Sequence, residues 1–305
     1  MMDAKTVLFI ALAAMTLFYL AVLAAGVRRA KQDGGEPTAP TLGGTLTGAI
    51  ANFFDTLGIG SFATTTAIFR HWKIVRDERM PGTLNVGNTL PTIAQAFIFT
   101  RLVPVDARTL VLMIAAAVLG AWLGAGVVSR WPRSRVQFGM GLAMFGAALL
   151  MLAAQLQIVP AGGELLRLDG SRLVAGLIGN FVLGALMTVG IGLYGPCMIL
   201  VSLLGMTPTA AFPIMMGSCA FLMPVASARF IRERAFDARA VIGMAIGGVP
   251  AVLVAAFLVK SLPLSAVRWL VVIVVTYTAA TLLMAARRER TASIAANAEM
   301  EKATI

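Results

Sequence analysis

The chain contains 305 residues, of which 59% are hydrophobic and only 13% are charged, and its mean hydropathy is +0.87. Ordinary soluble domains are about 45–50% apolar and about 25% charged, so this composition excludes a conventional soluble domain and predicts an integral membrane protein. The net charge of +11 comes from Lys and Arg in small groups at the ends of apolar runs. That distribution is typical of membrane loops that face a cytoplasm, and it does not favour a nucleic-acid partner.

The first apolar run extends from Val7 to Val27 and is followed by Arg28, Arg29 and Lys31. The hydrophobic core of a signal peptide is only about 7–15 residues long, and basic residues after a longer run act as a stop-transfer signal. We therefore expect a retained transmembrane helix, with signal-peptide cleavage as the alternative. The Gly- and Pro-rich segment from Gln32 to Pro40 predicts a linker after this helix.

Further apolar runs follow, and charged or Pro/Gly-rich turns separate them. They are Leu42 to Phe69, Leu84 to Thr100, Thr109 to Val128, Val136 to Ala154, Leu173 to Leu204, Phe212 to Ala228, Ala240 to Val259 and Trp269 to Ala286. The runs that begin at Leu42 and Leu173 are too long for one perpendicular span, because a helix rises about 1.5 Å per residue across a hydrocarbon core of about 30 Å. Each of the two also contains a Gly-x-Gly sequence near its middle.

The two long runs are copies of one another. GAIANFFD, from Gly48 to Asp55, resembles GLIGNFVL, from Gly176 to Leu183, and the tripeptide GIG recurs at 58–60 and 190–192. This predicts one extra helix followed by a duplicated unit. The expected organisation is an extra helix and linker at 1–40, a first repeat at 41–154, an inter-repeat loop at 155–172, a second repeat at 173–286 and a polar tail at 287–305.

Two topologies are open for an all-α polytopic bundle of this kind. All nine runs could cross the membrane, or the two long runs could be re-entrant hairpins that enter and leave on one side. With the amino terminus outside and the carboxyl terminus cytoplasmic, the hairpin alternative places more of the 25 Lys and Arg residues in the cytoplasm, so it fits the positive-inside rule better. It also makes the repeats inverted, an architecture that recurs in secondary transporters of the inner membrane.

Broken helices inside a membrane indicate a lined cavity, because free backbone groups must be satisfied by protein or water. A new half-helix amino terminus there carries partial positive charge and suits the oxygens of an anion. The alternative is that such glycines only allow close helix packing, which we expect for isolated glycines such as Gly120 and Gly247. The candidate substrate-binding residues are Asn52, Gly58, Gly60, Ser61, Thr64, Thr65, Asn85, Asn180, Gly190, Gly192, Tyr194, Cys197 and Ser218. Gln95 is expected to form an interhelical hydrogen bond.

Asp55 is the one feature of the first copy that the second copy lacks, because Leu183 stands at the matching place. An ionisable residue within a span is a functional hypothesis by default, since its insertion costs at least about 2.5–3.5 kcal/mol. A carboxylate repels an anion, so we assign Asp55 either to coupling with a proton or cation or to capping a half-helix.

The sequence contains no motif of a known enzyme class, and neither H-E-x-x-H, G-x-S-x-G nor a P-loop is present. The single histidine, His71, rules out a His-cluster metal site, and Cys197 and Cys219 lie inside apolar runs without zinc-site spacing. We expect no catalytic residue, no metal and no cofactor. The expected partners are a small anionic substrate, a proton or cation and the lipid bilayer.

The segment GNFVLGALMTVGIGLYGPCMILVSLLGM, its first-copy counterpart and the motifs PGTLNVGN and MMGSC that follow the two copies resemble the sulfite exporter TauE/SafE family of membrane permeases. The resemblance covers roughly residues 41 to 286. It implies an inner-membrane transporter of small anions, typically sulfite, sulfonates or related organosulfur compounds. An anion channel and a membrane assembly subunit are the alternative functions.

Overall fold

A computed structural model describes residues 4–34, 37–128, 133–156, 158, 163–187 and 192–303. Its helices are α1 (Ala4–Gly34), α2 (Leu42–Thr56), α3 (Ser61–His71), α4 (Met80–Leu102), α5 (Ala107–Val128), α6 (Arg133–Gln155), α7 (Gly170–Met187), α8 (Tyr194–Leu203), α9 (Ala211–Arg232), α10 (Ala238–Ser261) and α11 (Leu264–Ala303). Short 3-10 turns, Asp77–Arg79 and Pro208–Ala210, precede α4 and α9. The described residues form no strand beyond an isolated bridge, so the predicted all-α bundle is confirmed.

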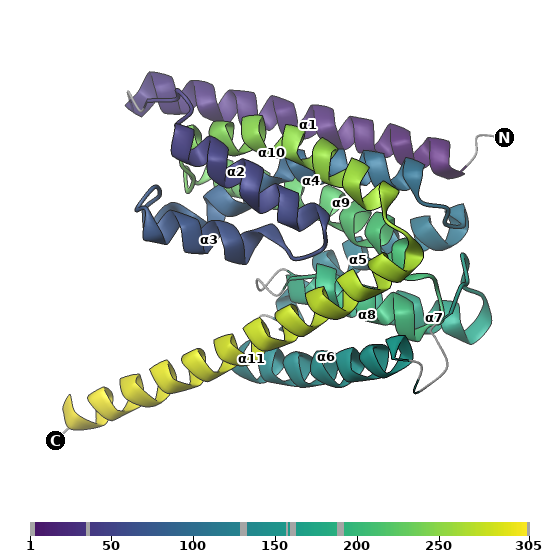
Figure 1. The fold of residues 1–305 in the computed structure, drawn as a ribbon. Helices are drawn as coiled ribbons and strands as arrows, with labels where there is room; N and C mark the ends of the chain where they lie inside the picture. The colour runs from purple at the N-terminus through teal and green to yellow at the C-terminus, as the bar shows by residue number, and fades with distance from the viewer. Residues whose placement is uncertain are drawn as a thin grey trace.

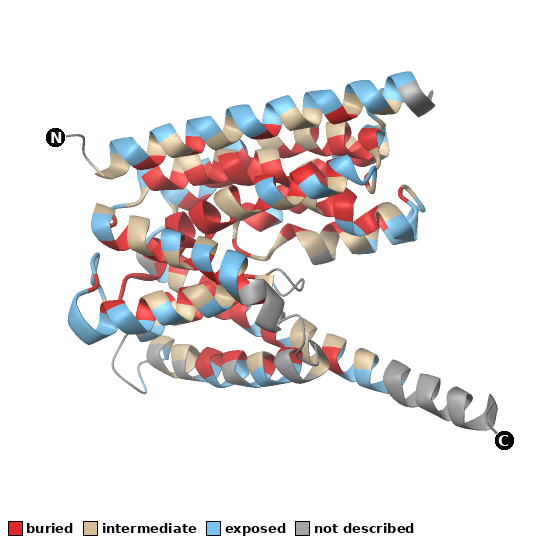
Figure 2. Ribbon diagram, turned by 180° about the vertical axis from the view of Figure 1, so that it is seen from behind, coloured by how far each residue is buried: buried red, intermediate tan, exposed pale blue. Residues whose placement is uncertain are grey.

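The helices fit a membrane environment by length and composition. Within the described residues, five segments are long and apolar enough to span a bilayer: Ala4–Gln32, Gly170–Met187, Pro208–Arg232, Ala238–Ser261 and Ser265–Thr291. Buried residues gather in the middle of the bundle, and the outer faces of α1, α6 and α11 are largely exposed (Figure 2). A chain that buries its polar centre and exposes apolar side chains outward is adapted to lipid.

Several helices extend beyond the predicted runs. The fourth helix begins at Met80, because Pro81 occupies its first turn, where the missing N–H costs little. The first helix continues to Gly34 and so takes up part of the predicted linker. The last helix continues to Ala303 and projects away from the bundle (Figure 1). The predicted polar tail at 287–305 is therefore helical over its described part.

After α1 the order of elements repeats, with α2 to α6 matching α7 to α11. In each set a pair of short helices comes first, and a 3-10 turn and three long helices follow. The α2–α3 pair forms a hairpin whose turn lies inside the bundle (Figure 1). We call the end where α3 stops and α4 begins the Arg70 end, and the end where α4 stops and α5 begins the Arg101 end.

The α2–α3 hairpin opens at the Arg70 end. A methyl group added at Gly43, near the start of α2, would lie 3.1 Å from Ile74 Cδ1, just beyond α3. The same end of α2 packs on Ala240 at the start of α10, because a methyl at Gly44 would lie 3.2 Å from its Cα. Both ends of the first hairpin therefore lie together.

The α7–α8 hairpin opens at the opposite, Arg101 end. The Leu165 N–H, ahead of α7, donates to Gly205 O at 3.1 Å, and Thr207 N–H, beyond α8, donates to Leu165 O at 3.0 Å. The α4–α5 loop joins the same group, since Asp106 N–H donates to Leu166 O at 2.9 Å. Two hairpins that open in opposite directions match the re-entrant, inverted alternative and not the one in which every run crosses.

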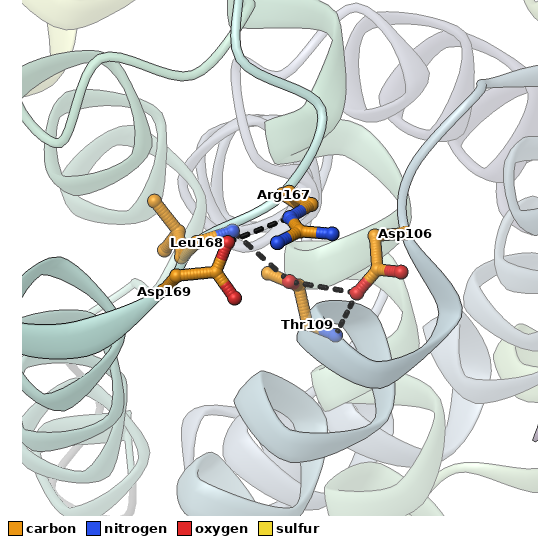
Figure 3. Close-up of polar contacts among 5 residues, drawn as sticks. All are labelled: Asp106, Thr109, Arg167, Leu168 and Asp169. Carbon is orange, nitrogen blue, oxygen red and sulfur yellow. Dashed lines mark hydrogen bonds and ion pairs between the residues drawn. The ribbon is translucent and has the colours of Figure 1, made fainter.

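Hydrogen bonds among Asp106, Thr109 and Leu168 hold the open end of the second hairpin against the start of α5 (Figure 3). The carboxylate of Asp106 accepts hydrogen bonds from Thr109 N at 2.9 Å and Thr109 Oγ1 at 3.0 Å, which caps α5. Thr109 Oγ1 in turn accepts from Leu168 N at 3.1 Å. Asp237 has the matching position in the second repeat, where it caps α10 by accepting from Ala240 N at 2.9 Å. Each connecting loop thus docks beside the hairpin of the other repeat.

Glycines bring the first helix of each hairpin close to a helix of the other repeat. In the α2–α10 contact, a methyl at Gly247 would overlap the carbonyl oxygen of Thr45. In the α5–α7 contact, a methyl at Gly120 would overlap the carbonyl oxygen of Phe181. The packing role expected for Gly120 and Gly247 is confirmed. Small residues at such crossings let backbones approach closely and replace the weak hydrophobic drive between helices in lipid.

We expect Gly247→Val to destabilise the bundle, because the added side chain must push the α2 and α10 backbones apart. Overpacking of this kind costs about 1–3 kcal/mol or more. The measurement is the thermal unfolding midpoint in detergent, followed by size-exclusion chromatography. Gly146→Val is the matched control, because a methyl at this glycine of α6 meets nothing within 4 Å. An equal loss of stability in both variants would contradict the close-contact explanation.

The extra helix α1 is part of the bundle. Tyr19 is 1% exposed, and its hydroxyl donates to Val86 O of α4 at 2.6 Å. The rings of Phe9 and Phe97 stack with centroids 6.0 Å apart. Because both contacts fall on α4, α1 holds that helix from outside the two repeats.

Candidate functional site

The first helix break depends on two glycines in unusual backbone conformations. Gly58 has φ 97° and Gly60 has φ 87°, a region that only glycine adopts at low cost. Leu57 to Gly60 separate the end of α2 from Ser61, the first residue of α3. The positive φ values turn the chain back, so the amino terminus of α3 is left inside the bundle.

Asp55 caps that amino terminus. Its side chain is buried, with 3% of the residue exposed, and its Oδ1 accepts a hydrogen bond from Ser61 N at 2.6 Å. A carboxylate in this position satisfies one of the free N–H groups and is favoured by the helix dipole. The capping alternative for Asp55 is therefore confirmed, and the coupling role stays a prediction.

Gln95 of α4 joins the two hairpins. Its Nε2 donates to Asp55 Oδ2 at 2.9 Å and to Thr56 Oγ1 at 2.9 Å. Its Oε1 accepts from the hydroxyl of Tyr194, in α8, at 2.9 Å. The predicted interhelical hydrogen bond of Gln95 is confirmed. Because the amide uses both ends, Asp55 of one repeat and Tyr194 of the other are held at a fixed separation.

Among the residues that the structure describes, no side chain caps the amino terminus of α8 after the second break. The helix begins at Tyr194, after Leu193, and Pro196 lies in its first turn. The first hydrogen bond back across the start runs from Cys197 N to Leu193 O at 2.9 Å. The initial N–H groups of a helix have no partner within it, so those of Tyr194 and Gly195 can bind an external acceptor. The two half-helix starts thus differ, since Asp55 covers only the first.

Both half-helix starts line one partly open cavity of about 120 Å³, which we call the central cavity. The cavity residues are Asp55, Ile59, Gly60, Ser61, Phe62, Thr92, Met187, Gly192, Leu193, Tyr194, Gly195, Cys219, Met223 and Thr278. They come from both repeats and from helices as distant in sequence as α2 and α11. None of these described lining residues is Lys, Arg or His, so polar interactions there come from hydroxyls, N–H groups and one carboxylate.

The structure brings together five of the predicted site residues in this lining: Asp55, Gly60, Ser61, Gly192 and Tyr194. The others that it describes lie outside the lining; they are Asn52, Gly58, Thr64, Thr65, Asn85, Asn180, Cys197 and Ser218. Gly190 falls outside the described residues. Gly58 instead packs on α8, because a side chain there would overlap the methyl group of Met198.

The paired asparagines bridge helices instead of facing the cavity. The Nδ2 of Asn52 donates to Gly48 O at 2.9 Å and to Asn88 Oδ1 at 3.0 Å. The Nδ2 of Asn180 donates to Met113 O at 2.7 Å. The structural alternative, an amide that satisfies backbone and neighbouring polar groups, describes these contacts. Both Oδ1 atoms are buried without a partner in the described structure.

Sequence reasoning missed the lining residues contributed by the long helices. Thr92 of α4 and Thr278 of α11 lie in apolar runs without a local motif, as does Met187 at the end of α7. Thr92 could have been found, because it continues the helical spacing of Asn85, Asn88 and Gln95 on one face of α4. The sequence carries no comparable signal for Thr278.

Inverted hairpins that meet at a cavity within a helical membrane bundle are an architecture that recurs in secondary transporters. The sequence model of the family described as "Sulfite exporter TauE/SafE" matches residues 1–151 and 172–304 of the chain. The chain therefore belongs to the sulfite exporter TauE/SafE family and is a membrane transporter of the sulfur-anion class. No significant match to a curated protein or to a solved structure was found.

Proposed function

We propose that the protein is a secondary transporter that carries a small sulfur oxyanion, such as sulfite or a sulfonate, through the central cavity. The observation that carries this proposal is that the amino termini of α3 and α8 line the same cavity. Free N–H groups and the aligned dipole make a helix amino terminus a binding site for anion oxygens. Two such termini, one from each repeat, favour a ligand with several acceptor oxygens.

The other residues that line the cavity offer further contacts for such an anion. Tyr194, Thr92 and Thr278 offer hydroxyl groups, and the thioethers of Met187 and Met223 offer a polarizable apolar face. A site without cationic side chains holds an anion through dipoles alone. Binding that is not too strong favours release, which a transporter needs as much as capture.

Asp55 gives the site a means of coupling. Its carboxylate already occupies the Ser61 N–H that an anion would use, and its negative charge repels an anion in the same cavity. A proton on Asp55 removes that charge and weakens the cap. We infer that proton binding at Asp55 and anion binding between α3 and α8 favour one another, which makes the transport a proton–anion symport.

We place the protein in the inner membrane with the Arg70 end in the cytoplasm, the amino terminus outside and the carboxyl terminus inside. The basic groups from Arg28 to Lys31, between Arg70 and Arg79, and between Arg229 and Arg239 support this orientation through the positive-inside rule. In intact cells, a cysteine at Arg101 should react with an impermeant thiol reagent, whereas a cysteine at Arg70 should react only after permeabilisation. The reverse result would invert the orientation.

Purified protein in liposomes should show saturable uptake of sulfite or a sulfonate, and an inward proton gradient should increase the rate. The panel should also contain sulfate, thiosulfate and an organic carboxylate, to define the class of anion. Saturation separates this transporter from an anion channel, whose flux follows voltage without saturating. If no anion in the panel moves above the rate of empty liposomes, the proposal is wrong.

A further inference from the structure

A continuous polar face on α4 leads away from the central cavity toward the Arg70 end. It consists of Asn85, Asn88, Thr89, Thr92 and Gln95, which share one side of the helix by their three- and four-residue spacing. Asn52 of α2 and Ser227 of α9 complete it on the neighbouring helices. We call these seven residues the α4 seam. Thr92 lines the cavity, and half-buried Asn85 lies nearest the start of α4.

Hydrogen bonds join the members of the α4 seam across helices. Ser227 Oγ donates to Asn85 Oδ1 at 2.9 Å, and its oxygen lies 2.9 Å from Thr89 Oγ1. On the other flank, Asn88 Oδ1 accepts from Asn52 Nδ2 at 3.0 Å. Gln95 connects the inner end to Asp55 at 2.9 Å. The hydrogen bonds thus form three groups along one face of α4, which are Gln95 with Asp55, Asn88 with Asn52, and Asn85 and Thr89 with Ser227.

The contact between α4 and α9 changes character toward the opposite, Arg101 end. There Phe99 and Phe212 stack with ring centroids 5.2 Å apart and an angle of 14° between the rings. Both residues are buried, and the stack closes the space between the two helices. In the second repeat, one hydrogen bond of the described structure joins polar side chains at the matching positions, from Asn180 Nδ2 to Ser218 Oγ at 3.4 Å. Hydrogen bonds between polar side chains around α4 are therefore more numerous toward the Arg70 end, among the described residues, than toward the Arg101 end.

The α4 seam also contains an unsatisfied acceptor. Asn52 is fully buried, and its Oδ1 has no partner within the described structure. A buried amide oxygen without a protein partner is a place where an ordered water is expected. Asn52 also lies close to the Asp55 group, because the hydroxyl of Thr56, which accepts from Gln95 Nε2, donates to Asn52 O at 2.7 Å.

We propose that the α4 seam is a hydrated proton path through which Asp55 exchanges protons with the Arg70 end, while the central cavity serves its exchange with the other side. This inference rests on the coupling role proposed for Asp55. The other titratable groups that face Asp55 are Tyr194 of α8 and Cys219 of α9. Among the described residues, α3 and α4 present Ser61 and Gln95 to it, and no cationic side chain acts on it. Asp55 is therefore the group that such a path would serve.

The test measures proton transfer to Asp55 without requiring transport. A pH jump on detergent-purified protein is followed by time-resolved infrared spectroscopy of the carboxyl C=O band that Asp55→Asn removes. Asn88→Leu and Thr89→Val should slow the appearance of this band by about a hundredfold, which is typical of losing a positioned proton-transfer group. Thr89→Ser keeps the hydroxyl and should restore the rate.

Thr100→Val is the matched control, because Thr100 is a buried threonine on the same helix beyond Gln95 and its hydroxyl has no partner in the described structure. It should leave the rate unchanged. Equal rates in all variants, slowing in Thr100→Val as large as in Thr89→Val, or a band that does not respond to pH would overturn the path. A wild-type protein that moves no anion would overturn the proposed function instead, and the infrared rates would still decide the path.

Discussion

Asp55→Asn is expected to uncouple transport from the proton gradient while anion exchange across the membrane continues. An asparagine at this position can still accept from Ser61 N through its Oδ1, so α3 keeps its cap. Its Nδ2 then replaces the acceptor that faced Gln95 Nε2, so the Gln95 amide must turn to offer its oxygen. The asparagine cannot gain or lose a proton. The variant therefore corresponds to a site that is held permanently in the uncharged state.

Coupling between two binding sites on one protein is typically worth about 1–3 kcal/mol, which is about 5–150-fold in affinity. The stimulation of uptake by an inward proton gradient should fall to none in Asp55→Asn, from a value in this range in the wild type. Counterflow is the exchange of labelled anion for unlabelled anion inside liposomes, and its rate should stay within about threefold of wild type. This limit corresponds to less than about 1 kcal/mol of free energy, since about 1 kcal/mol changes an equilibrium ratio about fivefold.

Gln95→Leu is the informative companion. It removes the contacts of the amide with Asp55, Thr56 and Tyr194 but leaves the carboxyl group in place. It should lower counterflow and gradient-driven uptake together, because the hairpins lose their link. If Asp55→Asn instead lowers both processes equally, Asp55 acts only as a cap, and the coupling ion enters elsewhere.

Much of the architecture could be predicted from the sequence, because the signals that define it are local. The two over-long apolar runs, each with a central GIG, predict two broken helices without any information on the rest of the chain. The asymmetric distribution of Arg and Lys then favoured hairpins over crossings, and the pairing of Leu165 with Gly205 and Thr207 agrees with it. Local signals of this kind can be interpreted without knowledge of tertiary contacts.

The composition of the site was less predictable for a physical reason. Polar residues near a break have two possible partners, a ligand or the backbone and side chains of a neighbouring helix. Asn52 and Asn180 bond to a neighbouring helix, because an amide at a close helix crossing must satisfy its own polar groups before it can bind a ligand. Thr278, from the last membrane helix, reaches the cavity only through the packing of the whole bundle.

The repeat is also less symmetric than its sequence suggests. In the first copy, Gly58 and Gly60 both have a positive φ and turn the chain back before α3. The first half-helix start carries its own carboxylate cap, whereas the second has no side-chain cap among the described residues. The duplicated helices therefore form the framework of the site, and Asp55, which occurs in one copy only, provides a charge that protonation can remove.

Gly60→Ala is expected to abolish most of the transport, although the new methyl group would meet nothing within 4 Å. The reason is the backbone, because Gly60 has φ 87° and ψ 130° as the residue that precedes α3. An L-residue in a sparsely populated region of this kind costs about 1–3 kcal/mol. The chain can relieve that strain by rotating the peptide, which turns the start of α3 and the Asp55 cap away from the cavity.

Counterflow by Gly60→Ala should fall by at least about tenfold, since about 1.4 kcal/mol corresponds to a factor of ten. Gly192→Ala is the matched comparison, because Gly192 also lines the cavity and a methyl there also meets nothing within 4 Å, and we expect it to lose much less. Thermal unfolding in detergent measures how much of each effect is stability. Equal losses of counterflow in the two variants would mean that added bulk, and not the backbone turn at Gly60, disables the site. The contrast between the two glycines therefore tests directly whether the orientation of the α3 amino terminus controls anion binding.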